Sequence, residues 1–466
     1  MEAPFQESTL DKRNRIFFGL GTVGRDMFYS VVSMYLLVFL TEVLNLPDAT
    51  MWWITGVLTV LRVFDALNDP IMGILVDNTN SRWGKFKPAM LAGALTGAVF
   101  MVLLFVDFGM GQSAYILFFA LCYILWDICY GANDIAYWSM LPTLSLEQKQ
   151  REKTGAFARI CANVGMFTVV VGILPVTNAM GDAMGSLKRA WFVFALVVAL
   201  LMIGFQMFTL LGVKEDRSRF KKEEKTTLKD MWRAIVHNDQ LLFTTIAMAL
   251  FMIGYSTTTS FGVYFFKYAY GNENMYSVFA AVLAVSQLTA LAVFPWFSKR
   301  FNRRQLYLYS TVLVLIGYLI FFFSPMHMLP LGVAGVCIFT GQAFIQLLML
   351  MFLADTIEYG QWKLGKRNDS VTFSLQPLIN KIGGAIASGV VSATVIISGI
   401  NSAQSAADVT ARGLLILKIA MLLLPLLCIV AGYFVYRRKY KIDSVFYAQI
   451  LGELEARGDI RKNTEV

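Results

Sequence analysis

The sequence predicts an all-α membrane protein with about twelve transmembrane helices. Of the 466 residues, 57% are hydrophobic and only 15% are charged, and the mean hydropathy is +0.59. A soluble domain is about half apolar and about a quarter charged, so a soluble enzyme of several domains is excluded. Apolar runs of about 20 residues, long enough to cross a bilayer as a helix, recur along the chain. They are continuous, whereas barrel strands alternate and need only about ten residues.

The spans follow one another with short connections. We expect them near residues 16–40, 51–76, 88–108, 113–141, 155–179, 190–213, 241–267, 275–298, 305–325, 329–355, 371–399 and 411–436. The polar first fifteen residues show no cleavage site after a short apolar core, so we expect no removable signal peptide.

The basic residues predict that both termini lie in the cytoplasm. With this orientation 31 of the 40 Lys and Arg fall in inner segments, and four fall outside: Lys188, Arg189, Lys267 and Arg412. Inner loops of membrane proteins carry such an excess. The net charge of +9 therefore faces anionic lipid, and we expect no nucleic-acid partner. The expected location is the plasma (inner) membrane of a bacterium.

A long charged connection, 214–239, separates six spans from six spans. Short basic loops after span two (81–87) and span eight (299–304) occupy matching places, which indicates an internal repeat. Six-plus-six halves around a midplane site describe the major facilitator fold. We expect an N-terminal half at 1–213, a cytoplasmic loop at 214–240, a C-terminal half at 241–437 and a cytoplasmic tail at 438–466.

Charged residues inside the spans point to function, because a charge at mid-bilayer costs about 2.5–3.5 kcal/mol on insertion scales. Most of them lie in the first half, which indicates that this half holds the coupling chemistry. They are Arg25, Asp26, Arg62, Asp65, Asp69, Asp127, Asp134 and Arg159, followed in the second half by Lys381 and Lys418.

Span two carries an oxygen-rich cluster. Asp65 and Asp69 are four residues apart and share a helix face, which Arg62 joins. Asn68 adds an amide, and Pro70 frees a backbone carbonyl. Such a group of oxygen atoms suits a hard monovalent cation. Alternatively, the two carboxylates share a proton. The alternative is a purely structural ion-pair cluster.

Span four carries a stripe at helical spacing. Tyr130, Asp134 and Trp138 stand at i, i+4 and i+8. A carboxylate accepts hydrogen bonds from sugar hydroxyls, and an aromatic ring packs on the apolar face of a pyranose. The alternative, that the aromatic side chains face lipid, fits Trp126 and Tyr137 better than Trp138.

Three further charges fit the same interpretation. Asp26, beside Arg25, offers a second bidentate acceptor in span one. Arg159 in span five can brace a carboxylate or donate to a hydroxyl.

The second half contributes few charges. Lys381 lies in a helix of small residues and needs an acidic partner across the halves, Asp134 or Asp65. Such a bridge would tie ligand occupancy to closure. We expect Lys418 to snorkel to the interface.

Three motifs resemble one family. They are Arg62-x-x-Asp65-x-x-Asn68-Asp69-Pro70, the loop Arg82–Pro88 and the stretch Asp355–Lys363. Together they are similar to the glycoside–pentoside–hexuronide:cation symporter family of the major facilitator superfamily. Stretches 133–142, 157–160 and 376–384 look most like the galactoside permeases of that family.

The resemblance implies a sugar symporter that works by alternating access, also able to exchange sugars. It implies a sugar site of Arg25, Asp26, Tyr130, Asp134, Trp138, Arg159, Gln376 and Lys381. It implies a monovalent cation site of Asp65, Asn68 and Asp69. Coupling or gating falls to Arg62, Asp127, Glu358 and Lys381. No resident cofactor is expected, since Na⁺ or H⁺ is co-transported, and the partners are the sugar and the bilayer.

The chain departs from the family pattern at several places. Gly131 stands where the family's cation site has a Thr, Arg25 where it has a Lys, and Lys366 where some members have a His. About thirty residues follow the last span, so regulation by a fused domain is expected to be absent or to act in trans.

Other functions remain open at this point. They are transport of a pentoside or a glucuronide, sodium-coupled transport of lysolipids, a membrane-embedded enzyme and a channel. The sequence shows no phosphate-binding loop and no nucleophile motif for an enzyme, and no repeated charged rings for a pore.

Overall fold

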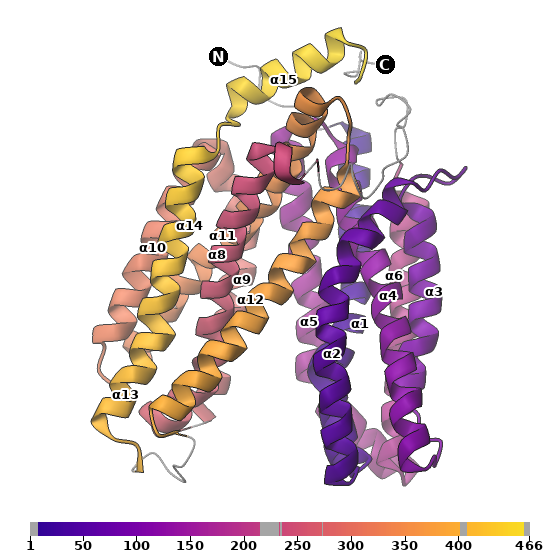
Figure 1. Cartoon of the computed structure of the whole chain (residues 1–466), viewed down its shortest axis with the longest axis vertical. Helices are drawn as coiled ribbons and strands as arrows, with labels where there is room; N and C mark the ends of the chain where they lie inside the picture. Colours follow the sequence, from indigo (N-terminus) through magenta and orange to yellow (C-terminus); the bar gives the residue numbers. More distant parts are fainter. Residues whose placement is uncertain (1–7, 215–232, 234, 273, 401–407, 461–466) are drawn as a thin grey trace. The chain divides into compact units, whose positions relative to one another are not determined.

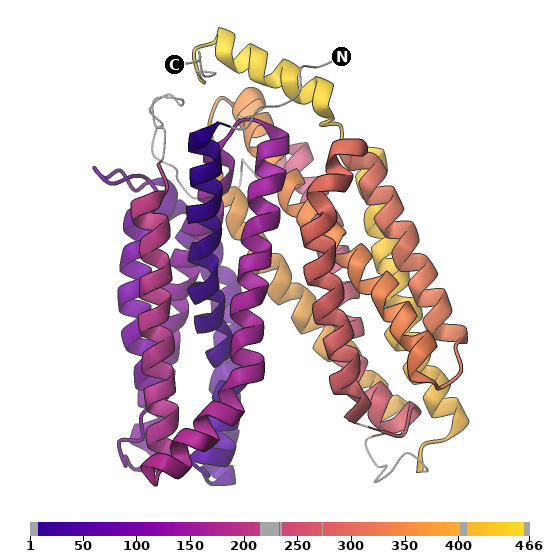
Figure 2. The ribbon, with the colours of Figure 1, turned by 180° about the vertical axis from the view of Figure 1, so that it is seen from behind.

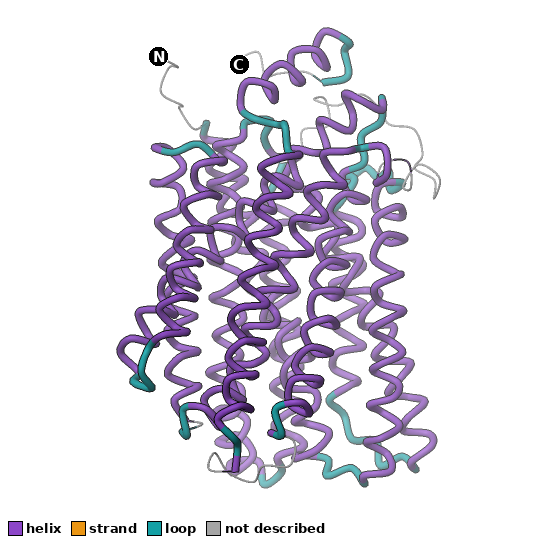
Figure 3. The backbone as a smooth tube through the Cα atoms, turned by 60° about the vertical axis from the view of Figure 1, so that its left-hand side comes forward, coloured by secondary structure: helices purple, strands orange, loops and turns teal. Residues whose placement is uncertain are grey.

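The computed structural model describes residues 8–214, 233, 235–272, 274–400 and 408–460. Within these ranges the side chains of residues 48, 59, 62, 63, 65–67 and 274 are not described. The described residues form helices joined by short loops, and Figure 3 shows no strand among them. This agrees with the predicted all-α class.

The first six helices follow the first six predicted spans. They are α1 (Thr9–Val38), α2 (Asp48–Asp77), α3 (Lys87–Leu104), α4 (Gln112–Leu144), α5 (Gln148–Met184) and α6 (Leu187–Gly212). The last eight are α8 (Asp239–Tyr264), α9 (Asn274–Arg300), α10 (Arg303–Phe323), α11 (Met328–Leu364), α12 (Asp369–Ile397), α13 (Ala411–Lys418), α14 (Leu424–Lys439) and α15 (Ser444–Ala456).

Eleven helices of the described part are long and apolar enough to cross a membrane. The remaining predicted span is α2, which is 30 residues long and begins with the apolar stretch Ala49–Leu58. The last span is one continuous helical run, α13 and α14 joined by a π-helical turn, Ile419–Leu423. Each of the twelve predicted spans thus corresponds to a helical segment.

The chain divides into two compact units. Unit 1 consists of Met1–Trp232, Lys366–Ser374 and Glu455–Val466, and unit 2 of Arg233–Gly365 and Leu375–Leu454. Most of the predicted middle loop, residues 215–232 and 234, lies outside the described residues.

In unit 1 the helices run alongside one another, as Figures 1 and 2 show from opposite sides. α1 packs along α5 and α6, and α4 packs against α2 and α3. Glycine allows a close approach of two helices: a Cβ on Gly93 of α3 would lie 2.5 Å from the carbonyl oxygen of Cys129 on α4. An apolar core that includes Phe28, Phe39 and Trp191 fills the interior.

In unit 2, α11 packs against α8, α9 and α10, and α14 packs along α8. The first helix of this unit ends like α1. α1 continues into a π-helical turn at Phe39–Val43 and α8 into one at Phe265–Ala269. In both, the next amide donates to the first carbonyl of the turn at 2.9 Å, from Leu44 to Phe39 and from Tyr270 to Phe265. This shared ending adds a structural feature to the repeat that the loops indicate.

α5 and α11 extend furthest beyond their predicted spans. α5 begins at Gln148, and α11 continues to Leu364. The stretch 355–363, expected after span ten, therefore lies within the helix. The reason is burial: Glu152, Asp355 and Glu358 are buried, although hydropathy marks them as polar loop residues. The predicted tail also contains a helix, α15.

Candidate functional site

Arg25 lies at the centre of the candidate site in unit 1. It stands midway along α1 and is only 2% exposed. Its guanidinium lies 2.8 Å from a carboxylate oxygen of Asp134 on α4 and 3.1 Å from one of Asp26 on α1. A buried charge needs such pairing, because burying a charge without a partner costs several kcal/mol. The carboxylates are more open, with 24% of the Asp26 and 18% of the Asp134 side chain exposed. The cluster therefore has a buried guanidinium at its centre and two partly exposed carboxylates that can accept hydrogen bonds.

Aromatic rings support the two arginines. The Arg25 guanidinium lies 4.4 Å from the ring centre of Tyr137 and 5.2 Å from that of Trp138. Arg159 of α5 lies 4.4 Å from the Trp138 ring. All three distances are within cation–π range. Tyr137 itself is fixed by a hydrogen bond from its hydroxyl to the Phe18 carbonyl. Trp138 is thus covered by Arg159 in this structure and serves as its platform.

Arg159 keeps an unused donor. Its Nε is buried and has no hydrogen-bond partner in the described part of the chain. A buried unsatisfied donor costs about 1–3 kcal/mol, so an acceptor arriving there would be bound favourably.

Tyr130 forms the aromatic side of the site together with Tyr29, which the sequence analysis missed. Their rings stack at 4.9 Å with an interplanar angle of 21°, and Tyr29 is 44% exposed. Tyr29 lies four residues after Arg25, hence on the same face of α1. This spacing is the signal that could have identified it.

The alternative interpretation, in which Trp126 and Tyr137 face lipid, is wrong. Both are buried in unit 1, at 2% and 0% exposure. α4 packs against α2, α3 and α5, and its aromatic residues fill the resulting interior.

Only part of the predicted cation cage can be placed. The side chains of Arg62 and Asp65 lie outside the described residues. Asn68 and Asp69 are buried on α2, and the Asn68 Nδ2 has no hydrogen-bond partner in the described ranges. A Cβ built on Gly131 of α4 would lie 3.7 Å from the Asp69 Oδ1. α2 and α4 therefore bring together Asp69 and the glycine that departs from the family pattern.

The remaining predicted residues are more scattered. Asp127 is half-buried on α4. In unit 2, Glu358 is fully buried on α11, and Gln376 and Lys381 are half-buried on α12. The Gln376 Oε1 is buried without a partner among the described residues. Their part in sugar binding or coupling stays a prediction, as does the snorkelling of Lys418, which is half-buried on α13.

An ion network at the inner end of unit 1 was not foreseen. Asp77, the last residue of α2, accepts hydrogen bonds from the backbone N–H groups of Ser370 and Val371, each at 3.0 Å. Lys85 lies 3.0 Å from Asp77 and 3.5 Å from Asp369. Asp77 therefore caps the N-terminus of α12, where a negative charge is stabilising.

The signature stretch of α11 makes similar contacts in unit 2. Asp239 accepts a hydrogen bond from the Tyr359 hydroxyl at 2.8 Å and pairs with Lys363. The Trp362 indole donates to Glu453 of α15 at 2.6 Å. The stretch 355–363 thus contacts α8 at the beginning of the sequence of unit 2 and α15 near its end.

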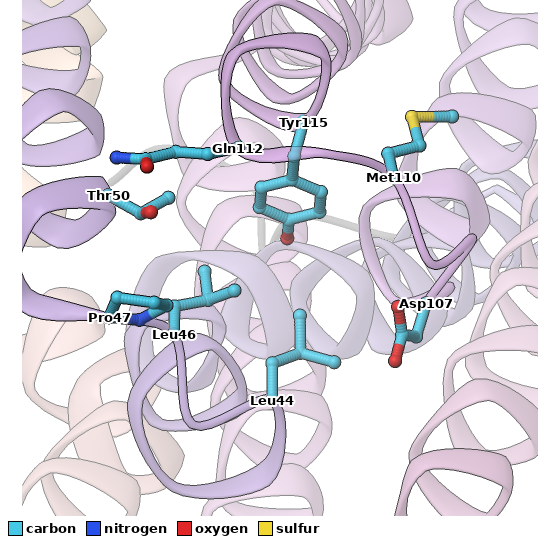
Figure 4. A pocket seen from close by; sticks show the side chains of 8 residues that line it. All are labelled: Leu44, Leu46, Pro47, Thr50, Asp107, Met110, Gln112 and Tyr115. Carbon is cyan, nitrogen blue, oxygen red and sulfur yellow. The ribbon is translucent and has the colours of Figure 1, made fainter.

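A pocket of about 210 Å³ lies at the outer end of unit 1, away from the Arg25 cluster. In Figure 4 the Tyr115 side chain extends between Met110 and Gln112 toward Leu44 and Leu46. No predicted site residue lines this pocket. Its lining residues are Leu44, Leu46, Pro47, Thr50, Asp107, Met110, Gln112 and Tyr115.

Comparisons with known proteins agree with one another. The sequence model of a family described as MFS/sugar transport protein matches residues 17–444. The lactose permease of Lactobacillus delbrueckii subsp. bulgaricus is 33% identical over 457 residues, covering 95% of this chain and 72% of that protein. The raffinose carrier protein of Pediococcus pentosaceus is 32% identical over 456 residues, covering 95% and 71%.

The solved structures give the fold. The crystal structure of the MFS transporter FucP in the outward conformation matches with a TM-score of 0.66, covering 93% of this chain and 99% of that one at 12% identity. The predicted fold, family and multi-pass plasma-membrane location are confirmed, and the relatives are transporters rather than enzymes. The chain belongs to the MFS/sugar transport protein family of the major facilitator superfamily.

Proposed function

We propose that this transporter is a cation-coupled symporter for a galactoside such as lactose or melibiose. The observation that carries the proposal is the Arg25 cluster, in which a buried guanidinium holds two partly exposed carboxylates, Asp26 and Asp134. The names of the relatives support the sugar class, since lactose and raffinose both contain a galactosyl unit.

The cluster offers both kinds of contact that a sugar needs. Asp26 and Asp134 accept hydrogen bonds from sugar hydroxyls, and the Arg159 Nε donates one to a hydroxyl oxygen. In the low dielectric of a closed site these bonds are stronger than in water. The exposed ring of Tyr29, backed by Tyr130, packs on the apolar side of the sugar.

The charge balance favours a neutral sugar. Two carboxylates, Asp26 and Asp134, face two guanidinium groups, Arg25 and Arg159, so the cluster has no net charge. A glucuronide would add an unbalanced carboxylate beside Asp26 and Asp134. Like charges brought close together in a poorly solvated site repel, and this repulsion disfavours the anionic alternative.

Cation coupling is assigned to Asp65, Asn68 and Asp69. The buried position of Asn68 and Asp69 supports this assignment, because a buried carboxylate is stabilised by a cation or a proton. The cation, Na⁺ or H⁺, binds first and neutralises the cage. Sugar must then tighten cation binding by the same factor by which the cation tightens sugar binding. The transporter carries cation and sugar across the membrane by alternating access. Exchange of external for internal sugar is another mode of the same transporter.

Counterflow in proteoliposomes tests the substrate class without any gradient. Vesicles loaded with unlabelled lactose should transiently accumulate radiolabelled lactose, and external melibiose should compete. Xylose and methyl glucuronide at equal concentration should compete poorly. Stronger competition by the glucuronide than by melibiose would overturn the galactoside assignment.

A further inference from the structure

A second pocket lies at the end of unit 2 that the basic residues place in the cytoplasm. It has a volume of about 350 Å³ and is formed by the start of α10 and the end of α14. No residue predicted for sugar, cation or coupling lines it. Its lining residues are Asn302, Arg304, Gln305, Leu308, Tyr433, Tyr436, Arg437 and Tyr440.

The two arginines of the pocket are weakly neutralised. Arg437 donates to the Tyr433 hydroxyl at 3.2 Å and forms no ion pair with any described residue. Arg304 donates to the Lys441 carbonyl at 3.3 Å, and the carboxylate it pairs with, Asp443, is 3.8 Å away. Two guanidinium groups whose donors are mostly unused form a site for an anion that accepts several hydrogen bonds.

Two tyrosines add unused donors. The phenol oxygens of Tyr436 and Tyr440 are buried and have no hydrogen-bond partner among the described residues. Their rings stack at 4.9 Å, and each side chain is less than a tenth exposed. Buried polar atoms are normally satisfied, so these two indicate an acceptor that the protein itself does not supply.

The outer faces of the same helices are apolar. Val312 and Ile316 on α10 and Leu427 and Phe434 on α14 are all exposed, as expected where helices meet lipid tails. A ligand at this pocket can therefore place a charged group against the arginines and a hydrocarbon part against the neighbouring helix surfaces.

We propose that this pocket binds the phosphodiester headgroup of an anionic phospholipid of the inner leaflet. Phosphate oxygens match the guanidinium donors of Arg304 and Arg437 and accept from the buried phenols. Basic pockets between helices on the cytoplasmic side have the required chemistry for such headgroups.

Native mass spectrometry of the full-length protein in neutral detergent tests the proposal, with phosphatidylglycerol, phosphatidylcholine and inorganic phosphate as separate probes. We expect phosphatidylglycerol to bind at least tenfold more tightly than phosphatidylcholine. Arg437→Gln removes one charge-assisted contact and should weaken the binding of phosphatidylglycerol about tenfold. Tyr440→Phe keeps the ring and removes only the hydroxyl, and it should weaken binding several-fold.

Arg438→Gln is the matched control, because Arg438 is exposed, carries the same charge one residue along and does not line the pocket. It should bind phosphatidylglycerol within twofold of the wild type. Equal losses in Arg437→Gln and Arg438→Gln would show diffuse attraction to basic residues and overturn the site. Displacement of the lipid by millimolar inorganic phosphate would overturn the assignment of the ligand as a phospholipid headgroup. Full binding by Tyr440→Phe would overturn the role of the phenols.

Discussion

The Arg25 guanidinium and the Asp134 carboxylate form an ion pair of 2.8 Å that joins α1 to α4 inside unit 1. Arg25 is almost fully buried, and Asp134 retains some exposure. Removing one partner of a buried pair leaves an uncompensated charge, at a cost of about 3–5 kcal/mol. A ligand that contacts Asp134 therefore acts directly on the charge that holds these two helices together.

Asp134→Asn tests this relationship. The amide accepts hydrogen bonds but no longer neutralises Arg25, so we expect at least a tenfold weaker affinity for lactose and a lower melting temperature. Counterflow and thermal unfolding in detergent measure the two effects. Asp107→Asn is the control, because Asp107 is an exposed loop carboxylate in the pocket at the outer end of unit 1. Its replacement should leave counterflow unchanged. Wild-type affinity in Asp134→Asn would remove Asp134 from the sugar site.

Arg159→Lys separates charge from shape. Lysine keeps the positive charge but lacks the planar group that lies on Trp138 and the free Nε donor. We expect the KM for lactose uptake to rise about tenfold, with little change in melting temperature. An unchanged KM would mean that Arg159 contributes only its charge.

Gly131→Thr tests the cation site. The new Cβ would meet the Asp69 carboxylate at ordinary van der Waals distance, so this atom is accommodated, and the threonine adds a hydroxyl oxygen near that carboxylate. Oxygen ligands favour Na⁺, and we expect the Na⁺ concentration for half-maximal stimulation of uptake to fall several-fold. Gly131→Val has nearly the same shape without the oxygen and should not show this gain. The same gain in both variants would mean that helix packing, not an added ligand, is responsible.

The ion pair between Lys188 and Asp107, at the outer end of unit 1, predicts a pH dependence of stability. The hydrogen bond from Lys188, at 2.7 Å, lowers the pKa of Asp107 below its usual range. A carboxyl group with a lowered pKa in the folded state adds stability above its unfolded pKa of about 3.9, and this stability disappears as the pH falls through the folded pKa. The small difference in melting temperature between wild type and Lys188→Gln should be constant from pH 7 to 5 and shrink below about pH 4. A difference that grows on acidification would contradict this assignment.

Hydropathy predicts the membrane spans well, because each apolar run long enough for the bilayer has few alternatives to a helix. The same method places the start of α5 too late and the end of α11 too early, since Glu152 and Glu358 are polar yet buried. Helix ends that are buried in protein carry no hydropathy signal.

The charges of the candidate site are visible in the sequence, but their partners are not. Arg25 and Asp134 stand out because charges are rare in spans, whereas their pairing depends on how α1 and α4 pack. The capping of α12 by Asp77 joins residues 293 positions apart, and no local pattern indicates it. Tyr137 is buried although Leu117 and Leu121 of the same helix are exposed, and the sequence alone does not show which side of α4 faces its neighbours.

The measurement that tests the central claim most directly is uptake of radiolabelled lactose into proteoliposomes under an imposed Na⁺ gradient or an imposed pH gradient. The account predicts accumulation above equilibrium under at least one gradient in the wild type and in Asp107→Asn, and much weaker accumulation in Asp134→Asn. Lactose that only equilibrates under both gradients, with protein shown to be folded, would contradict cation-coupled symport.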